Sequence, residues 1–561
     1  MFESNSESRI RLNRREALLF SAAAATGLVM AAPAHASDST KTGVHQEPGY
    51  CSTPPTVVAK TQYGKVRGFR EGDVLIFKGI PYGQNTGAEN RWLPAKPPIP
   101  WKDEYPALTY GANSPQYLHD NTDIGQSFLQ DWDDGWQSED MLKLNVWTPS
   151  LTGSRAVMVY LHGGGYQFGS AYELPAQDGA QQARYHDVVS ITLNHRLGLL
   201  GFLDVSAVGG SRYQDSINIG MADLVVALRW VQENIANFGG DPNRVMIYGQ
   251  SGGGGKVANL MGMPSAKGLF HRASIQSGGG GAGSAEEARE FARQMVKQLG
   301  IASNDMAALQ KIDWASLDAA ATATAASMKT GGFSIPFFPV PASILRHNWG
   351  PTVDGRIITM RAFQDAAPEI SKDVPLLIGS VSEEGAAYHL DPSKEEWIAE
   401  LTKVLGAEKG NALAAVMMKA NPEKSIRTLS YGVAGVSFRN NVVRMAKMKH
   451  DLHAAPVYQY FFSWQTPMLD GVAGAWHTSE LQFCFDNTLR CEQGTGNTPE
   501  AQTLARKMAG AWTNFAKTGN PSQAGLPWQP SDPERNQTMV WNNDCRMVDD
   551  PEGDARKILL S

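Results

Sequence analysis

The sequence predicts an α/β protein in which helices cover both faces of a mostly parallel β-sheet. Buried strands are expected at residues 157–161, 188–193 and 245–248, where apolar residues follow one another almost without interruption. Residues 221–237, before the last of these strands, carry apolar side chains at helical spacing. A strand–helix–strand order of this kind is typical of parallel sheets that are buried on both faces.

Length and composition limit the class of protein. The chain has 561 residues, of which 42% are hydrophobic and 19% are charged. This balance is typical of a globular protein and excludes a disordered chain, a coiled coil and a collagen. The formal net charge is −6, and no block rich in Lys and Arg follows the N-terminus. We therefore expect no nucleic-acid partner.

Residues 1–36 are predicted to be a removable export signal. Four arginines form its basic front: Arg9, Arg11, Arg14 and Arg15. An apolar run at 17–32 and a small-x-small pattern at 34–36 follow. The pair Arg14-Arg15 resembles the twin-arginine signals of bacteria. Because the apolar run is short for a membrane-spanning helix, we expect export to the periplasm or the medium without stable membrane insertion.

The rest of the chain is expected to hold a poorly ordered extension, residues 37–56, and a single domain, residues 57–561. The four cysteines are Cys51, Cys484, Cys491 and Cys545. In an oxidising compartment they allow up to two disulfides in three alternative pairings, and their spacing matches no zinc site. Free buried thiols are equally compatible with a domain of this size, so the pairing stays open.

The sharpest motif is a serine between glycines, Gly249-Gln250-Ser251-Gly252-Gly253, placed directly after the strand at 245–248. A tight strand-to-helix turn needs small residues two positions before and two after the serine. The turn raises the hydroxyl out of the sheet and sets it at a helix N-terminus, where negative charge is favoured. Ser251 is therefore the candidate nucleophile. A phosphate-binding loop is excluded, because Gln250 and Val257 stand where Gly and Ser or Thr are required.

A second glycine cluster, His162-Gly163-Gly164-Gly165, follows the strand at 157–161. Such a turn exposes backbone N–H groups that could bind an oxyanion, although an ordinary flexible loop is the alternative. Two clusters at the carboxyl ends of parallel strands are expected to meet at one edge of the sheet. The pattern Gly278-x-Gly280-x-x-Gly283 lacks the second strand of a dinucleotide-binding unit, because residues 302–312 look helical.

Further runs along the chain carry a resemblance to a known family. They are Gly79-Ile80-Pro81-Tyr82, Ser138 to Pro149, His162 to Tyr166, Asn194-His195-Arg196-Leu197-Gly198, Gly201-Phe202-Leu203, Phe238-Gly239-Gly240-Asp241-Pro242, Gln276-Ser277-Gly278 and Asn514 to Pro521. In this combination the chain resembles the type-B carboxylesterase/cholinesterase family of α/β-hydrolases. The resemblance implies an α/β-hydrolase fold with a large, mostly parallel central sheet flanked by helices, and with insertions around the active-site mouth.

The resemblance also implies partners for Ser251. The family's acid is a Glu followed by Gly after a strand, which matches Glu384 after the strand expected at 375–379, with Glu383 as the alternative. The family's base lies in a His-x-x-Glu segment, which matches His477. The chain order Ser, Glu, His agrees with that of α/β-hydrolases.

The remaining site residues are also implied by the resemblance. The oxyanion is expected to be held by the N–H groups of Gly164, Gly165 and Gly252. Tyr166 and Phe168 are expected near the mouth of the substrate pocket. Neither a metal nor an organic cofactor is expected.

Several positions depart from the family pattern. Gln250 stands where Glu is usual, Gly252 where Ala is usual and Met141 where Cys is frequent, so the family's first disulfide loop is absent. His195 replaces a frequent Tyr. Lys256 follows a run of four glycines and is expected to be a solvated lysine, with a cation near the pocket as the alternative.

The expected function is that of an exported serine carboxylesterase that hydrolyses small-molecule esters through an acyl-serine intermediate. An amidase, a carbamate hydrolase or a polyester hydrolase on the same site is the alternative among enzymes. From another class, a catalytically silent, cholinesterase-like adhesion module is the alternative. The oligomeric state and the physiological ester stay open.

Overall fold

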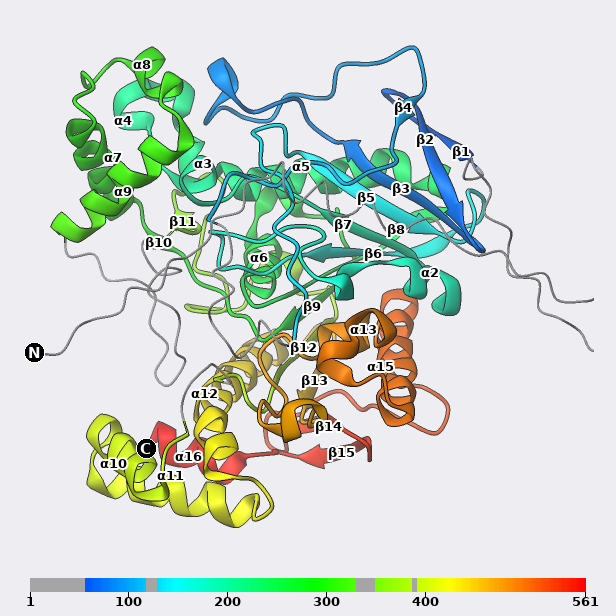
Figure 1. Cartoon of the computed structure of the whole chain (residues 1–561), viewed down its shortest axis with the longest axis vertical. Coiled ribbons are helices and arrows are strands. Elements are labelled where there is room, and N and C mark those ends of the chain that lie inside the picture. Colours follow the sequence, from blue (N-terminus) through cyan, green and yellow to red (C-terminus); the bar gives the residue numbers. More distant parts are fainter. Residues whose placement is uncertain (1–55, 118–128, 329–348, 386–390) are drawn as a thin grey trace, which may run out of the picture. The chain divides into compact units, whose positions relative to one another are not determined.

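The computed structural model describes residues 56–117, 129–328, 349–385 and 391–561. The predicted export signal, the segment up to residue 55 and Cys51 lie outside these residues. From Pro54 to Ser561 the chain forms one compact unit. Within it, helices lie on both faces of a central sheet (Figure 1).

The central sheet has 13 strands in the order β1-β2-β3-β5-β7-β6-β8-β9-β12-β13-β14-β15, with β4 paired to β2. The strands are β1 (Thr56–Thr61), β2 (Gly64–Glu71), β3 (Val74–Pro81), β4 (Tyr105–Pro106), β5 (Lys143–Thr148), β6 (Arg155–Leu161), β7 (Val189–Leu193), β8 (Gly240–Gln250), β9 (Arg272–Gln276), β12 (Leu376–Val381), β13 (Val457–Phe462), β14 (Gln537–Trp541) and β15 (Arg546–Asp549). A separate pair consists of β10 (Gly283–Ser284) and β11 (Thr352–Val353).

The middle of the sheet is parallel and its edges are antiparallel. Strands β7, β6, β8, β9, β12, β13 and β14 run parallel as neighbours, whereas β1, β2, β3 and β5 at one edge and β15 at the other are antiparallel to their neighbours. The three strands predicted from the sequence are confirmed as β6, β7 and β8. The predicted mostly parallel sheet is therefore confirmed in the middle of the sheet, where the glycine motifs lie.

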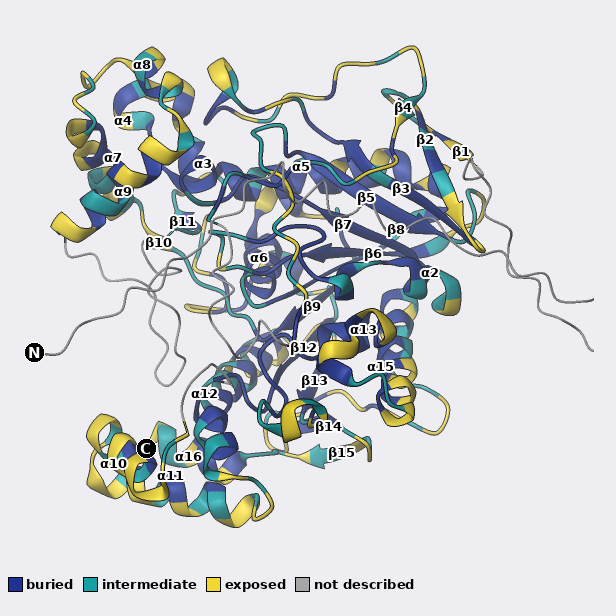
Figure 2. Ribbon diagram, viewed as in Figure 1, coloured by how far each residue is buried: buried dark blue, intermediate teal, exposed yellow. Residues whose placement is uncertain are grey.

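The two faces of the sheet pack against different helices. On β6, Val157 and Val159 belong to one core cluster, and Met158 and Tyr160 belong to another. This alternation follows from the two-residue period of a strand. The first cluster includes residues of α5 (Ile219–Asn234), α6 (Gly252–Gly262) and α12 (Ile426–His450), and the second includes residues of α13 (Leu481–Cys484) and α15 (Pro499–Thr518). Figure 2 shows the central strands buried almost throughout.

The helices are α2 (Ala180–His186), α3 (Gly198–Phe202), α4 (Ser206–Gly209), α5 (Ile219–Asn234), α6 (Gly252–Gly262), α7 (Ala285–Gln298), α8 (Met306–Lys311), α9 (Trp314–Met328), α10 (Lys394–Leu405), α11 (Ala407–Ala420), α12 (Ile426–His450), α13 (Leu481–Cys484), α14 (Glu492–Thr495), α15 (Pro499–Thr518) and α16 (Gly553–Leu560). The predicted helix at 221–237 is confirmed as α5, which is followed by a 3₁₀ turn and ends at Gly239 in the left-handed region. Residues 306–311 are helical, as expected from the sequence.

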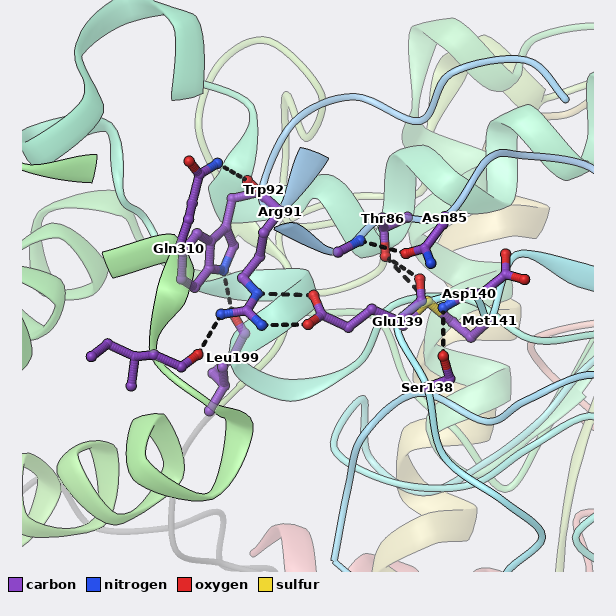
Figure 3. Close-up of polar contacts among 12 residues, drawn as sticks. Asn85, Thr86, Arg91, Trp92, Ser138, Glu139, Asp140, Met141, Leu199 and Gln310 are labelled. Atoms are coloured by element: carbon purple, nitrogen blue, oxygen red, sulfur yellow. Dashed lines mark hydrogen bonds and ion pairs between the residues drawn. The ribbon is translucent and has the colours of Figure 1, made fainter. Parts of the chain in front are cut away.

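The run Ser138 to Met141 has a structural role in this chain. The carboxylate of Glu139 forms an ion pair with the guanidinium of Arg91, and its backbone carbonyl accepts hydrogen bonds from the N–H and the hydroxyl of Thr86 (Figure 3). Met141 is fully buried, and the Thr86 hydroxyl lies 3.5 Å from its sulfur. These contacts tie the segment that precedes β5 to the loop that follows β3.

Three further observations concern the described residues only. Every helix in them is too short or too polar to span a lipid bilayer. No cluster of three or more His, Cys, Asp or Glu in them could hold a metal ion. Within the same residues, Cys484 and Cys491 are buried free thiols, and Cys545 is a partly buried free thiol.

Candidate active site

Ser251 lies at a strained turn between β8 and α6. Its backbone has φ 57° and ψ −123°, a conformation that costs energy for a residue with a side chain. The N–H of Ser251 donates to the carbonyl oxygen of Gln276 at 2.8 Å, which fixes the turn to the end of β9. Gly252 is the first residue of α6, so its N–H lacks an acceptor within the helix. The sequence-based prediction of a strand–turn–helix arrangement around Ser251 is confirmed.

The glycines around Ser251 are required by close packing. A Cβ at Gly249 would lie 2.6 Å from both the carbonyl carbon of Gly253 and the carbonyl oxygen of Leu161. A Cβ at Gly253 would overlap the same Leu161 oxygen. The start of α6 therefore rests directly on the backbone at the end of β6.

The second glycine cluster forms a turn beside Ser251, which we call the oxyanion turn (residues 162–165). Gly164 and Gly165 have φ of 81° and 56°, in the left-handed region. Within the described part of the chain, the N–H groups of these two glycines donate no hydrogen bond. A Cβ built on Gly163 would lie 3.5 Å from the Cβ of Ser251. Two unpaired donors thus lie in the turn that contacts Ser251.

Glu384 and His477 meet at the carboxyl ends of β12 and β13. The carboxylate of Glu384 is buried and contacts Nδ1 of His477 in a short hydrogen bond. Its other oxygen accepts the N–H of Val381 at 3.1 Å, which holds the carboxylate in place. The ring of Phe438, from α12, lies 5.9 Å from the imidazole ring. The structure therefore brings together the acid and the base that the resemblance implied.

Gln250 connects His477 to the serine turn. Its amide nitrogen lies 3.2 Å from Nε2 of the imidazole. Since Gln250 directly precedes Ser251, this contact places the imidazole beside the serine turn. The amide contacts the ring without adding a negative charge.

Glu383, the alternative acid, points elsewhere. Its carboxylate accepts Nζ of Lys424 at 2.7 Å, the N–H of Ala475 at 2.8 Å and the amide of Gln465 at 3.1 Å. Its backbone pairs with Trp476 in a parallel bridge. Glu383 therefore ties the loop after β12 to the loop that carries His477, and Glu384 rather than Glu383 contacts the imidazole.

A third buried carboxyl group, that of Glu480, lies close to Glu384. Burial raises the pKa of Glu480 to about 8, and the negative charge of Glu384 adds to the effect. Its Oε1 lies 3.4 Å from the hydroxyl of Tyr460. A carboxyl group with this pKa is mostly protonated at neutral pH.

Tyr166 and Phe168 follow the oxyanion turn directly. Tyr166 has φ 65°, its ring packs edge-on against Phe202, and its hydroxyl accepts the amide of Asn259 at 3.2 Å. Burial raises the pKa of the Tyr166 phenol. A Cβ at Gly164 would overlap the carbonyl oxygen of Phe168. Both aromatic residues therefore support the shape of the turn, and their place in a substrate pocket stays a prediction.

The expectation that Lys256 is solvated is wrong. Its side chain is fully buried under the oxyanion turn, and Nζ donates to the carbonyl oxygen of His162 at 2.8 Å. A signal for this was present in the sequence. Lys256 lies four residues after Gly252, and residues four apart share one face of a helix. The lysine therefore had to lie on the face of α6 that carries a predicted oxyanion donor.

The order of the sheet, the serine at the turn after β8, and the carboxylate and imidazole after later strands define the α/β-hydrolase fold. The chain matches the carboxylesterase family over residues 55–555, and it belongs to that family. It is accordingly a hydrolase that acts on carboxylic esters.

Individual relatives support this assignment. The chain is 32% identical to the para-nitrobenzyl esterase of Bacillus subtilis (strain 168) over 506 residues, which cover 90% of this chain and 98% of the relative. It is 32% identical to the phenmedipham hydrolase of Pseudarthrobacter oxydans, over 84% of this chain and 92% of the relative. A solved esterase from anaerobic Clostridium hathewayi, described as hydrolysing aliphatic aromatic polyesters, is similar with a TM-score of 0.73 and 31% identity, over 90% of this chain and 99% of that chain.

Proposed function

We propose that this protein is an exported serine carboxylesterase in which Ser251, His477 and Glu384 act as nucleophile, base and acid. The contact between His477 and Glu384, beside the serine turn, is the observation that carries the proposal. A carboxylate on Nδ1 favours the tautomer in which Nδ1 carries the proton and the lone pair of Nε2 can accept another, and it stabilises the imidazolium that forms. The family to which the chain belongs supports the same class of chemistry.

The reaction follows from these positions. Nε2 of His477 takes the hydroxyl proton of Ser251 as the oxygen attacks the ester carbonyl carbon, and the carbonyl oxygen becomes an oxyanion. The oxyanion collapses, the bond to the alcohol oxygen breaks, and the imidazolium returns its proton to the leaving alcohol. Water, activated by the same imidazole, then hydrolyses the acyl-serine and releases the carboxylic acid.

The proposed oxyanion donors are the N–H groups of Gly164, Gly165 and Gly252. The first two are unpaired within the described residues, and the third begins α6. Donors fixed in advance at the position where charge develops lower the barrier, and the loss of a comparable donor costs about 10²- to 10³-fold in rate.

Export is part of the proposal and rests on the sequence alone. The twin-arginine-like pattern at Arg14-Arg15 and the small-x-small pattern at 34–36 support it. Replacing both arginines by lysine in the full chain, in a bacterial host with twin-arginine export, is expected to leave the precursor uncleaved in the cytoplasm. Unchanged export of this variant would contradict the twin-arginine assignment.

The catalytic assignment is tested by hydrolysis of p-nitrophenyl acetate, butyrate and octanoate by the purified protein and by Ser251→Ala. We expect the variant to fold and to lose about 10⁶-fold in kcat, as in other enzymes of this mechanism. Equal inactivity of both folded proteins on these esters would favour the adhesion module. Full activity of Ser251→Ala would contradict the proposed nucleophile.

Polyester hydrolysis is the second candidate, because a solved neighbour is described as an esterase that hydrolyses aliphatic aromatic polyesters. Release of soluble acid from a thin film of such a polyester, measured beside Ser251→Ala, tests it. Comparable rates on the film and on p-nitrophenyl butyrate would favour polyester hydrolysis as the function. Matched esters and anilides in the same assay distinguish an esterase from an amidase.

A further inference from the structure

A fully buried lysine lies under the oxyanion turn. Lys256 is 0% exposed, and its Nζ donates to the carbonyl oxygen of His162 at 2.8 Å and lies 3.4 Å from that of Gly163. Burial of a cation is costly, and a partner that removes this cost is usually a carboxylate. Within the described residues, the ammonium instead donates to two backbone carbonyls of the oxyanion turn.

Peptide geometry links one of these carbonyls, that of Gly163, to an oxyanion donor. In a trans peptide the C=O and the N–H point in opposite directions, and the C=O of Gly163 belongs to the same peptide unit as the N–H of Gly164. The ammonium lies 3.4 Å from that carbonyl, which Nδ1 of His162 also contacts at 3.2 Å, and it holds the N–H of Gly164 pointing away from Nζ. It also draws electron density toward the oxygen, which makes this N–H a stronger donor.

We propose that Lys256 is a positioning residue, whose ammonium group orients and polarises the peptide of Gly163 and Gly164 so that the N–H of Gly164 stabilises the oxyanion. The proposal rests on the proposed function, because it assigns a role in the same reaction. Lys256 touches neither substrate nor reacting atoms. It acts through the backbone of the turn.

Close packing leaves the turn little freedom to find another position. A Cβ at Gly252 would lie 2.5 Å from the backbone nitrogen of Gly165. One at Gly255 would lie 2.6 Å from the hydroxyl oxygen of Tyr166. The glycines before Lys256 thus bring the first turn of α6 against the oxyanion turn, and the lysine side chain contacts the turn from the same helix.

Several titratable groups surround Lys256, and together they define its charge. The imidazoles of His162 and His195 lie 5.2 Å apart, and burial together with the charge of Lys256 lowers the pKa of both. The carboxylate of Glu173 attracts the ammonium, and the ring of Tyr166 lies 5.9 Å from Nζ. Burial outweighs the attraction and lowers the pKa of Lys256 to about 7.

The chain supplies a matched control in Lys449, in the last turn of α12. This lysine is also buried, and its Nζ donates to the carbonyl oxygens of Ser371 and Lys372 at 2.8 and 2.6 Å. Burial lowers its pKa to about 8. Residues 371 and 372 precede β12, at the end of that strand opposite to Glu384. Lys449 therefore shares the chemistry of Lys256 but lies away from the proposed site.

The experiment compares Lys256→Met and Lys449→Met, which remove the charge and keep a side chain of similar length. Thermal midpoint, kcat and KM for p-nitrophenyl butyrate, and inhibition by an alkyl trifluoromethyl ketone are measured. The ketone reports the oxyanion site, because Ser251 adds to its carbonyl carbon and the carbonyl oxygen becomes an oxyanion. We expect both variants to lower the thermal midpoint.

Only Lys256→Met is expected to lower kcat, by about 10- to 100-fold, and to weaken the ketone by a similar factor while KM changes less than about threefold. Equal kcat and ketone affinity in the two variants would overturn the proposal. So would a parallel loss of kcat and ketone affinity in Lys449→Met. If Lys256→Met does not fold, Lys256→Gln, which keeps a neutral donor, is judged by the same comparison.

A second measurement uses the wild-type protein alone. Since burial lowers the pKa of Lys256 to about 7, the ammonium loses its charge as the pH rises through this value, and we expect kcat at saturating substrate to decline above it. A kcat that stays constant to pH 10.5 would overturn the proposal. The proposed function fails if the wild type is as inactive as Ser251→Ala. The Lys256 proposal alone fails if the wild type is active and Lys256→Met keeps its kcat and ketone affinity.

Discussion

Two adjacent carboxylates after β12 occupy very different surroundings. Glu384 contacts an imidazole, whereas Glu383 contacts an ammonium group and the backbone of the neighbouring loop. Both side chains are about 1% exposed, so burial does not distinguish them. The difference lies in their partners. The carboxylate of Glu384 can stabilise a positive charge on His477, whereas the carboxylate of Glu383 holds the loop that carries His477.

The largest difference between the two carboxylates is expected in catalysis. Glu384→Gln keeps the size of the side chain but presents an amide to Nδ1, so the imidazole loses both its orientation and the charge that stabilises the imidazolium. We expect kcat on p-nitrophenyl butyrate to fall by about 10⁴-fold. Glu383→Gln serves as the matched control and is expected to lose less than about tenfold. The opposite order would transfer the role of the acid to Glu383.

For the free energy of unfolding we expect the opposite order, with the larger loss in Glu383→Gln. Glu383→Gln leaves the ammonium of Lys424, whose side chain is only 13% exposed, without its carboxylate, and we expect a loss below the cost of about 3–5 kcal/mol for breaking a fully buried pair. Urea unfolding at neutral pH measures the loss. Lys424→Met combined with Glu383→Gln removes the orphaned charge and should recover much of it. A double variant less stable than Glu383→Gln alone would show that the ion pair is not what this carboxylate contributes.

Glu480, the third buried carboxyl group of the region, differs from the other two in the pH dependence of stability that we expect from it. Its pKa is raised to about 8 in the folded state, from an unfolded value of 4.5, so the folded state binds the extra proton between these values. The contribution of this group to stability is therefore present below pH 4.5 and is lost as the pH rises to 8, by up to about 1.4 kcal/mol per pH unit. In Glu480→Gln this loss should be absent. Urea unfolding of both proteins at pH 5, 6.5 and 8 checks the prediction, and a difference in stability that stays constant with pH would contradict it.

The central strands and the serine turn could be predicted because their signals are local. A continuous apolar run before glycines predicted β8, and the spacing of Gly249 and Gly253 around Ser251 predicted a tight turn between this strand and a helix. The structure supplies the physical reason, since a Cβ at either glycine would collide with backbone.

Features that depend on contacts between distant parts of the chain were harder to predict from the sequence. The choice between Glu383 and Glu384 depends on the bridge between Glu383 and Trp476, which the sequence does not reveal. For Lys256 the expectation failed, because most lysines are solvated and only the packing of α6 against the oxyanion turn buries this one.

We propose that His477 activates Ser251 while the carboxylate of Glu384 holds Nδ1 of the imidazole. The most direct test is labelling with diethyl p-nitrophenyl phosphate, in which the serine oxygen bonds to phosphorus and p-nitrophenolate leaves. Intact-mass measurement should find one diethylphosphoryl group per chain on the wild type, placed on Ser251 by peptide mapping, with much slower labelling of Glu384→Gln. Absence of the label from the folded wild type, or its appearance at the same rate on Ser251→Ala, would contradict the claim.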